Sequence, residues 1–251
     1  MIYFIGAGPG DPELITVKGA RLLKEADVVI YTGSLVNPRV LDYCRQGVEI
    51  HNSATMTLEE VLEVMRGAAR QNRTVARVHT GDPGLYGAIQ EQMDALAAEG
   101  IPFQVIPGVS SFLAAAAAVP HELTLPGVTQ TVILTRMEGR TAVPEKEKLS
   151  ELARHRSTMC IFLSVQQIDR LVDELLEGGY SPDTPVLVVE KASWPEERII
   201  RSDLKGIAHQ VRQAGITRTA LIMVGEVFAA SYQPSRLYDP RFSHGYRKGE
   251  P

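Results

Sequence analysis

The sequence contains few cysteines and no cysteine motif. Two of its 251 residues are cysteines, Cys44 and Cys160, and they lie far apart without a Cys-x-x-Cys pair. The sequence therefore indicates neither a disulfide framework nor a zinc site, and such cysteines are typical of a reducing compartment. The histidines are scattered without metal-ligand spacing, so we expect no bound metal.

Long apolar runs and an excess of positive charge are also absent. No apolar stretch reaches the roughly 18 residues that a membrane span needs, and a strand pattern begins at Ile2 where a signal peptide would lie. We therefore expect a cytoplasmic protein without a membrane partner. The net charge of -4 argues against a nucleic-acid partner, although a local basic patch for a polyanionic ligand remains open.

The sequence does contain β-branched runs that alternate with helical periodicity, which is typical of an α/β fold. Two helix starts are marked chemically, because Thr57 with Glu60 fits a capping box and Thr16 fits an N-cap. In the first part of the chain the pattern predicts strands over 2–5, 28–31, 75–78 and 103–106, and helices over 17–26, 58–70, 86–98 and 112–119.

A stretch with Pro120, Pro126 and Gly127 is typical of a linker. We place a domain boundary there and predict two α/β domains, an N-terminal one over residues 1–120 and a C-terminal one over residues 121–251. In the second domain the pattern predicts strands over 131–135, 159–163, 186–189 and 221–224, and helices over 145–155, 168–177 and 204–213. The polar residues 243–251 are expected to be loosely held.

A glycine-rich loop follows the first predicted strand, with the sequence Gly-Ala-Gly-Pro-Gly-Asp-Pro at 6–12. Glycines allow positive φ and a close approach of a ligand to the backbone. A dinucleotide fingerprint would need glycine where Asp11 stands, a helix directly after it, and an acid at the end of the second strand. The loop therefore lacks that fingerprint, and two interpretations remain open: a tight strand-to-helix turn or a ligand loop of another kind.

Two similar loops follow later strands, at 79–87 and at 107–111. Loops at the carboxyl ends of parallel strands meet at one edge of the sheet, where open α/β domains bind ligands. We therefore expect these three loops to converge. For the side chains of Asp82, Ser110 and Ser111, capping of the following helix is an alternative that does not exclude backbone contacts to a ligand.

The strings at 6–16, at 81–83 (Gly-Asp-Pro) and at 107–111 (Pro-Gly-Val-Ser-Ser) resemble the tetrapyrrole methylase family, and the resemblance covers nearly the whole chain. It implies two unlike α/β domains with a cleft between them, S-adenosylmethionine as the methyl donor with S-adenosylhomocysteine as product, and a homodimer. By position, the donor site of the family corresponds to Pro9, Thr80, Gly81, Asp82, Leu85, Ser110, Ser111, Leu163, Ala192 and Ala220. For Leu163 and Ala220 the alternative is an ordinary core position.

Within the family, the strings at 32–36, 54–60, 135–141 and 235–240 resemble the branch that methylates C11 of precorrin-4 in cobalamin biosynthesis. The uroporphyrinogen III methyltransferases carry Tyr-Asp-Arg-Leu-Val after the second strand, whereas this chain has Tyr31-Thr32-Gly33-Ser34-Leu35-Val36. The missing acid and arginine disfavour a uroporphyrinogen substrate. We expect precorrin-4 or cobalt-precorrin-4, and the sequence does not distinguish them.

Methyl transfer to a carbon needs positioning of the two reactants and assistance to proton removal. By its position after the first loop, Asp11 is the candidate for that assistance, and an Asx-type turn ahead of Pro12 is the alternative. Because precorrins carry many carboxylates, arginine and lysine are expected on the substrate side. The candidates are Arg136 and Arg140, followed by Lys191, Arg39 and His79, with ordinary solvated side chains as the alternative.

Other functions remain open at this stage. One is a methylase of the same fold that acts on another tetrapyrrole, on RNA or on a protein. The other is a non-catalytic nucleotide-binding module, which would explain the glycine loops without chemistry.

Overall fold

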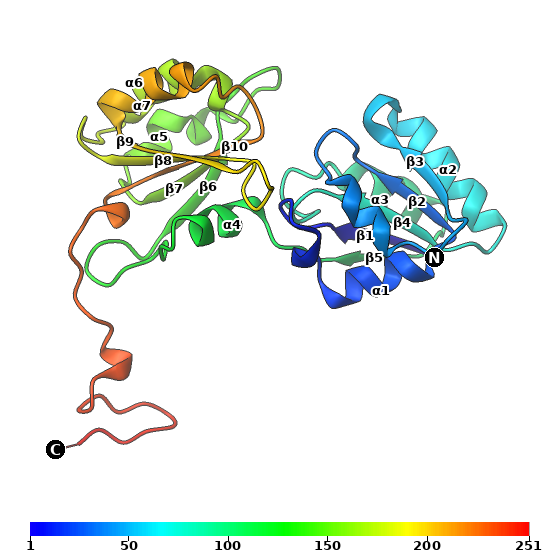
Figure 1. Ribbon diagram of the computed structural model, residues 1–251, viewed down its shortest axis with the longest axis horizontal. Coiled ribbons are helices and arrows are strands. Elements are labelled where there is room, and N and C mark those ends of the chain that lie inside the picture. The colour runs from blue at the N-terminus through cyan, green and yellow to red at the C-terminus, as the bar shows by residue number, and fades with distance from the viewer. Residues whose placement is uncertain (251) are drawn as a thin grey trace. The chain divides into compact units, whose positions relative to one another are not determined.

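The computed structural model describes residues 1–250, which divide into two compact units. The first unit comprises Met1–Ala118 together with Lys191–Arg198, and the second comprises Val119–Glu190 and the described residues from Ile199 onward. Each unit contains its own sheet and its own helices (Figure 1). The division after Ala118 lies in the region where Pro120 and its neighbours predict a linker, and the short segment 191–198 joins the first unit from much later in the sequence.

The sheet of the first unit is parallel throughout its five described strands. The strand order is β3-β2-β4-β1-β5, so β1 lies between β4 and β5 and the carboxyl ends of all three share one edge. The strands are β1 (Ile2–Gly6), β2 (Val28–Tyr31), β3 (Glu49–Asn52), β4 (Val75–His79) and β5 (Phe103–Ile106).

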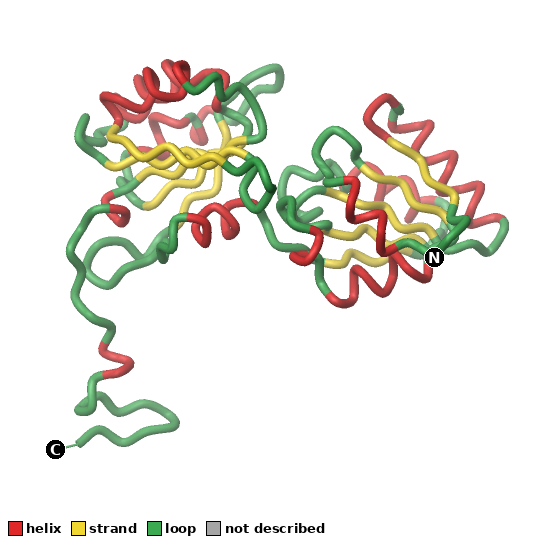
Figure 2. The backbone as a smooth tube through the Cα atoms, in the orientation of Figure 1, coloured by secondary structure: helices red, strands yellow, loops and turns green. Residues whose placement is uncertain are grey.

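Helices cover both faces of this sheet (Figure 2). On one face Ile5, Val29 and Val78 pack with Leu22 and Leu23 of α1, and on the other face the alternate strand residues pack with α2 and α3. This alternation is the expected consequence of side chains pointing to opposite faces of a strand. The covering helices are α1 (Val17–Glu25), α2 (Leu58–Arg70) and α3 (Gln90–Ala98); the unit also contains α4 (Ser111–Ala118) after β5 and the 3-10 turns η1 (Pro12–Leu14), η2 (Pro38–Tyr43) and η3 (Ser53–Thr55).

Both predicted helix starts are confirmed. The Thr16 hydroxyl accepts a hydrogen bond from the Gly19 amide at 3.1 Å. Thr57 and Glu60 form the complete capping box, in which each side chain accepts from the other residue's backbone amide. One amide at the start of α1 and two at the start of α2 would otherwise lack these partners, so the contacts fix where the helices begin.

The second unit has a mixed sheet, unlike the parallel sheet of the first unit. Its order is β6-β7-β10-β8-β9, with β6 parallel to β7 and with β10 antiparallel to both of its neighbours. One hydrophobic cluster joins the sheet to α5, α6 and α7. The strands are β6 (Val132–Arg136), β7 (Thr158–Phe162), β8 (Pro185–Glu190), β9 (Arg198–Asp203) and β10 (Ala220–Val224); the helices are α5 (Leu149–Ala153), α6 (Ile168–Glu177) and α7 (Leu204–Gln213).

Some predicted elements are wrong at their ends or were missed. The helix expected over 86–98 begins at Gln90, because Tyr86 and Ala88 have φ values of 57° and 49° that a right-handed helix does not allow. The helix expected over 145–155 is a 3-10 turn, Glu145–Glu147, followed by α5. Strands β3 and β9 were not predicted, since their exposed residues lack a continuous apolar run. None of the helices in residues 1–250 is long and apolar enough to cross a membrane.

Candidate functional site

The three glycine-rich loops meet at the carboxyl edge of the first sheet, as the sequence predicts. We call them loop 1 (residues 6–12), loop 2 (79–87) and loop 3 (107–111). Gly8 and Gly81 form an isolated antiparallel bridge, in which the Gly81 amide donates to the Gly8 carbonyl at 2.8 Å and the Gly8 amide donates to the Gly81 carbonyl at 3.3 Å. Loops 1 and 2 are therefore joined backbone to backbone.

Glycine is required at this junction because the backbones lie too close for any side chain. A Cβ atom on Gly6 would lie 2.6 Å from the Gly108 Cα and 2.6 Å from the Gly81 carbonyl oxygen, and a Cβ on Gly108 would overlap the same oxygen. Gly8 and Gly81 also have positive φ, at 79° and 61°, a region that other residues rarely adopt. The loops thus expose backbone at the sheet edge with no side chain between them.

Asp82 joins loop 2 to loop 3. Its Oδ2 accepts from the Gly108 amide at 2.8 Å, and its Oδ1 accepts from the Gly84 amide at 2.8 Å. The alternative role of Asp82 as a cap of the following helix is wrong, because α3 begins at Gln90 with Ile89 at its N-cap and without a side-chain cap. The carboxylate instead fixes the shape of two ligand-loop candidates at once.

Three side chains from elsewhere in the chain hold loop 1. The Asn37 amide group donates to the Gly10 carbonyl at 2.8 Å, Trp194 Nε1 donates to the Pro9 carbonyl at 3.0 Å, and the Ser193 hydroxyl accepts from the Asp11 amide at 3.0 Å. Sequence reasoning missed all three residues. The nearest signal was the position of Ala192, directly before Ser193, among the donor-site residues that the family resemblance implies.

The Asp11 carboxylate forms the turn that the sequence offered as an alternative. Its Oδ1 accepts from the Glu13 amide at 2.9 Å, and Asp11 is the N-cap of η1. Asp11 is half-buried. This contact orients the carboxylate at the end of loop 1 and accounts for the Asp-Pro pair structurally.

A buried arginine lies in the middle of β4, two residues before the strand ends. Arg77 is 6% exposed, and burial lowers its pKa to about 10, so it stays charged near neutral pH. Its Nε donates to the Gln92 side-chain oxygen at 3.2 Å and its Nη1 donates to the Ser53 hydroxyl at 3.0 Å. Nη1 also lies 3.4 Å from the Thr32 hydroxyl. These neutral partners connect β4 to α3 and to the loops that follow β2 and β3.

His79 is buried next to this arginine on β4. It is 4% exposed, its Nε2 has no hydrogen-bond partner in the described residues, and its ring centroid lies 6.1 Å from that of Phe4. Burial, and secondly the charge of Arg77, lowers its pKa to about 3. His79 is therefore uncharged near neutral pH, and any contact that it makes with a carboxylate would be that of a neutral ring.

The candidate donor-site residues divide between the units. Ser110 and Ala192 are buried, and Leu85 and Ser111 are half-buried. These four belong to the first unit, as do Pro9, Thr80, Gly81 and Asp82.

Leu163 and Ala220 belong to the second unit. The interpretation of Leu163 as an ordinary core residue is wrong, because Leu163 is 70% exposed. Its φ is 55°. Ala220, in contrast, packs against the hydrophobic cluster of that unit.

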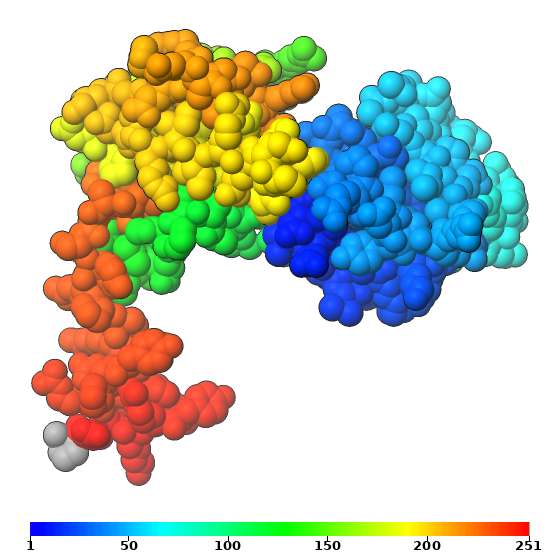
Figure 3. All heavy atoms as spheres, in the orientation of Figure 1, coloured from blue at the N-terminus to red at the C-terminus, as the bar shows by residue number. Residues whose placement is uncertain are grey.

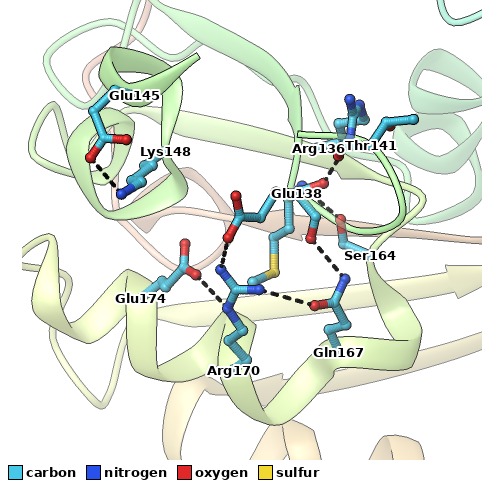
Figure 4. Close-up of polar contacts among 10 residues, drawn as sticks. Arg136, Glu138, Thr141, Glu145, Lys148, Ser164, Gln167, Arg170 and Glu174 are labelled. Carbon is cyan, nitrogen blue, oxygen red and sulfur yellow. Dashed lines mark hydrogen bonds and ion pairs between the residues drawn. The ribbon is translucent and has the colours of Figure 1, made fainter. Parts of the chain in front are cut away.

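In the second unit, Arg136 holds the loop that carries Arg140 (Figure 4). Its guanidinium donates to the carbonyls of Thr141 and Ala142 at 3.1 and 3.0 Å, while the Met137 amide donates to the Ser164 hydroxyl at 2.9 Å. Arg140 itself is exposed. Of the two arginines, Arg140 is the one whose side chain faces solvent, and Arg136 fixes the loop on which it stands.

Figure 4 also shows a network of ion pairs beside this loop. Arg170 binds Glu138 at 2.7 Å and Glu174 at 2.9 Å, and its contact lowers the pKa of Glu138. A cavity of about 620 Å³ lies here, and its lining consists mainly of carboxylates and of cations that pair with them. Carboxylates in excess over cations make this cavity unsuited to a ligand rich in carboxylates.

The remaining basic candidates lie in the first unit. The Lys191 ammonium group is 5.8 Å from the centroid of the Trp194 ring and 3.6 Å from a Glu196 carboxylate oxygen. Arg39 is exposed at the start of η2. Within residues 1–250 no group of histidine, cysteine, aspartate or glutamate side chains is arranged to hold a metal ion.

Comparisons with known proteins agree with this architecture. A model of the tetrapyrrole (corrin/porphyrin) methylases matches residues 1–208. A cobalt-precorrin-4 C(11)-methyltransferase of Methanocaldococcus jannaschii is 57% identical over 98% of this chain and 96% of its own length.

Two solved structures extend the comparison. A cobalt precorrin-4 methyltransferase, described as a cobalamin biosynthetic enzyme, superposes with a TM-score of 0.89 at 49% identity, covering 91% of this chain and 96% of that one. A uroporphyrin-III C-methyltransferase from Thermus thermophilus, solved with S-adenosylhomocysteine, has a TM-score of 0.75 at 32% identity and covers 91% of this chain and 93% of its own. Both the sequence and the fold match along most of the chain. The chain therefore belongs to the tetrapyrrole (corrin/porphyrin) methylase family.

Proposed function

We propose that this chain transfers a methyl group from S-adenosylmethionine to C11 of precorrin-4 or cobalt-precorrin-4, a step of cobalamin biosynthesis. The observation that carries the proposal is the 57% identity, over 98% of the chain, to a cobalt-precorrin-4 C(11)-methyltransferase. Similarity of this extent covers both units and all three glycine loops. It favours precorrin-4 or its cobalt form as the substrate, in a family whose members act on several different tetrapyrroles.

The residues at the sheet edge fit a methyl donor. Loops 1, 2 and 3 offer backbone without intervening side chains, because Gly6 and Gly108 leave no room for a Cβ and Gly81 has a positive φ of 61° that other residues rarely adopt. Backbone amides and carbonyls can read the polar edges of adenine, and apolar side chains such as Leu85 can contact its faces. We propose that Pro9, Thr80, Gly81, Asp82, Leu85, Ser110, Ser111, Leu163, Ala192 and Ala220 form the donor site.

When bound, the donor supplies an electrophilic methyl group attached to a positively charged sulfur. The tetrapyrrole carbon is the nucleophile, so the protein needs no nucleophile of its own, and its residues act by holding the reactants in line and excluding water. Asp82 contributes by fixing loops 2 and 3 through its two hydrogen bonds. We propose Asp11, whose carboxylate lies at the end of loop 1, as the group that orients substrate or accepts a proton.

On the substrate side we propose Arg140 as the principal contact to a tetrapyrrole carboxylate. It is exposed, and Arg136 holds its loop through hydrogen bonds to the carbonyls of Thr141 and Ala142. Lys191 and Arg39 are further cationic candidates, and His79 is a neutral one. Charge-assisted hydrogen bonds of this kind are stronger than neutral ones and select for anionic substrates.

We also propose that the protein works as a cytoplasmic homodimer, as the family resemblance implies. Sedimentation of the purified chain tests the dimer, and a mass of one chain would refute it. The enzymatic proposal is tested by incubating the protein with radiolabelled S-adenosylmethionine and precorrin-4 or its cobalt form. Label in the tetrapyrrole supports it. Donor binding without transfer to either form would favour another substrate of the same fold, or a non-catalytic binding module.

A further inference from the structure

A short segment late in the sequence is built into the first unit. Residues Lys191–Arg198 run from the end of β8 to the first residue of β9, yet they pack with the first 118 residues. We call them the clamp segment. In Figure 3 their yellow atoms lie against the dark blue atoms of the N-terminal residues.

The clamp segment binds the backbone of loop 1 directly. Trp194 Nε1 donates to the Pro9 carbonyl at 3.0 Å, and the Ser193 hydroxyl accepts from the Asp11 amide at 3.0 Å. These contacts hold the peptide groups on both sides of Gly10. Together with Asn37, these two side chains therefore hold the backbone of loop 1.

Packing at Gly10 shows that the contact is close. A Cβ atom on Gly10 would overlap the Trp194 indole ring, so glycine at this position admits the tryptophan. The Lys191 ammonium group lies 5.8 Å from the centroid of the same ring. The half-buried indole thus packs against loop 1, and the nearby cation adds a cation–π attraction.

The backbone of the clamp segment is also held in an uncommon conformation. Lys191 and Ser193 have φ values of 50° and 68°, which residues other than glycine adopt rarely and keep only where the surroundings enforce it. The Ser193 amide donates to a Glu197 carboxylate oxygen at 2.7 Å, and this bond closes the turn. The turn aims the Ser193 hydroxyl at loop 1.

We propose that the clamp segment positions loop 1 for the methyl donor, with Trp194 and Ser193 as positioning residues. The inference rests on the proposed function, since loop 1 contains Pro9 of the proposed donor site. A loop already held in its binding conformation loses less entropy when a ligand binds, and affinity rises accordingly. Loss of either contact is expected to weaken donor binding while the tetrapyrrole affinity stays as it is.

The test uses S-adenosylhomocysteine as an unreactive probe and three variants of the full chain. Trp194→Phe removes the Nε1 donor and keeps an aromatic ring. Ser193→Ala removes the hydroxyl. Ser193→Gly also removes it, and glycine adopts the φ of 68° at this position without strain. Ser202→Ala is the matched control, because Ser202 in β9 accepts one hydrogen bond from Gln210 outside the clamp segment. Calorimetry gives the dissociation constant of each protein, and thermal unfolding gives its stability.

The wild-type chain adds a direct readout, because Trp194 is its single tryptophan. Titration with the probe is expected to change the intensity or wavelength of tryptophan fluorescence. Each of the three clamp variants is expected to raise the dissociation constant roughly fivefold, the effect of one lost hydrogen bond. The Ser202→Ala control is expected to bind as the wild type does.

Two failures are distinguishable. If the wild type does not bind the probe at all, the proposed donor function is refuted, and this inference with it. If the wild type binds but all three clamp variants bind equally well, the inference is refuted and the donor function stands. Should Trp194→Phe fold poorly, the two Ser193 variants decide the question alone.

Discussion

Asp82 and Gly108 are joined by a hydrogen bond of 2.8 Å from the Gly108 amide to the Asp82 carboxylate. The two residues follow different strands, β4 and β5, on either side of β1. Together with the bridge between Gly8 and Gly81, this bond makes the three glycine loops one connected structure. The arrangement of the proposed donor site therefore depends on contacts among its own loops.

Removal of the Asp82 carboxylate is expected to loosen loops 2 and 3. Asp82→Ala leaves two amides without their acceptor, which costs about 1–3 kcal/mol of unfolding free energy, and it weakens donor binding. Asp82→Asn keeps one acceptor oxygen, so its stability and donor affinity should lie between those of the wild type and of Asp82→Ala. Denaturant unfolding and probe titration measure both effects. Asp169→Ala, which removes an exposed partner of Arg212, is the control, and an Asp82→Ala protein with the same stability and affinity as this control would refute the role.

Two glycine-to-alanine changes are expected to act in opposite directions. Gly108→Ala puts a Cβ into the Gly81 carbonyl and should lower the unfolding free energy by about 1–3 kcal/mol or more. Gly67 lies in α2, and a Cβ there would lie 4.0 Å from the nearest side-chain atom. Gly67→Ala should therefore raise the unfolding free energy by about 0.5–1 kcal/mol, since alanine favours helix. Unfolding curves of both variants check the signs. Equal effects of the two changes would show that the loop junction tolerates side chains.

His79 is expected to make the protein less stable in acid. Its folded pKa is about 3 against a reference value of 6.5, so between these values the unfolded chain binds a proton that the folded chain does not. Stability attributable to His79 is therefore complete above about pH 6.5 and is lost as the pH falls toward 3, at up to about 1.4 kcal/mol per pH unit.

The His79→Phe variant isolates this effect. Its ring can pack near Phe4, and no hydrogen bond of Nε2 is lost because that atom has no partner in residues 1–250. We expect the unfolding free energy of the variant relative to the wild type to rise as the pH is lowered from 6.5 to 4. Parallel stability curves for the two proteins across that range would contradict the buried, neutral state of His79.

Arg140 and Arg136 are expected to separate substrate binding from loop structure. Arg140→Ala should weaken tetrapyrrole binding roughly tenfold or more, as one charge-assisted hydrogen bond is lost, with donor affinity and stability unchanged. Arg136→Ala should lower the melting temperature as well, because it removes the bonds to the carbonyls of Thr141 and Ala142. Arg154→Ala, an exposed arginine in the second unit, is the control. Equal losses of donor and tetrapyrrole affinity in Arg140→Ala would reject its assignment.

The sequence predicts most of the secondary structure because the local signals are strong. Helices α2, α6 and α7 have the predicted bounds, since amphipathic periodicity marks all three and side-chain caps also mark α2 and α7. Strand β3 was missed because its exposed Glu49-Ile50-His51-Asn52 joins the sheet by pairing with β2, which is a tertiary contact. The start of α3 was misplaced because left-handed residues at 86 and 88 leave no pattern in the residue types.

The candidate site was predictable where glycine and strand order decide it. Three loops after β1, β4 and β5 must meet if the sheet is parallel, and they do. The contacts of Asp82 with Gly108, and of Trp194 and Ser193 with loop 1, were not predictable, because they join residues 26, 185 and 182 positions apart in sequence. Neither spacing nor composition marks such pairs.

The position of the transferred methyl group tests the central claim most directly. The purified chain would be incubated with precorrin-4, and separately with its cobalt form, in the presence of S-adenosylmethionine whose methyl carbon is isotopically labelled. Carbon NMR of the product then locates the label. The account predicts a labelled methyl group on C11, and the faster substrate identifies the natural form. Label at any other carbon would contradict the account, as would a lack of transfer to both substrates by a protein that binds the donor.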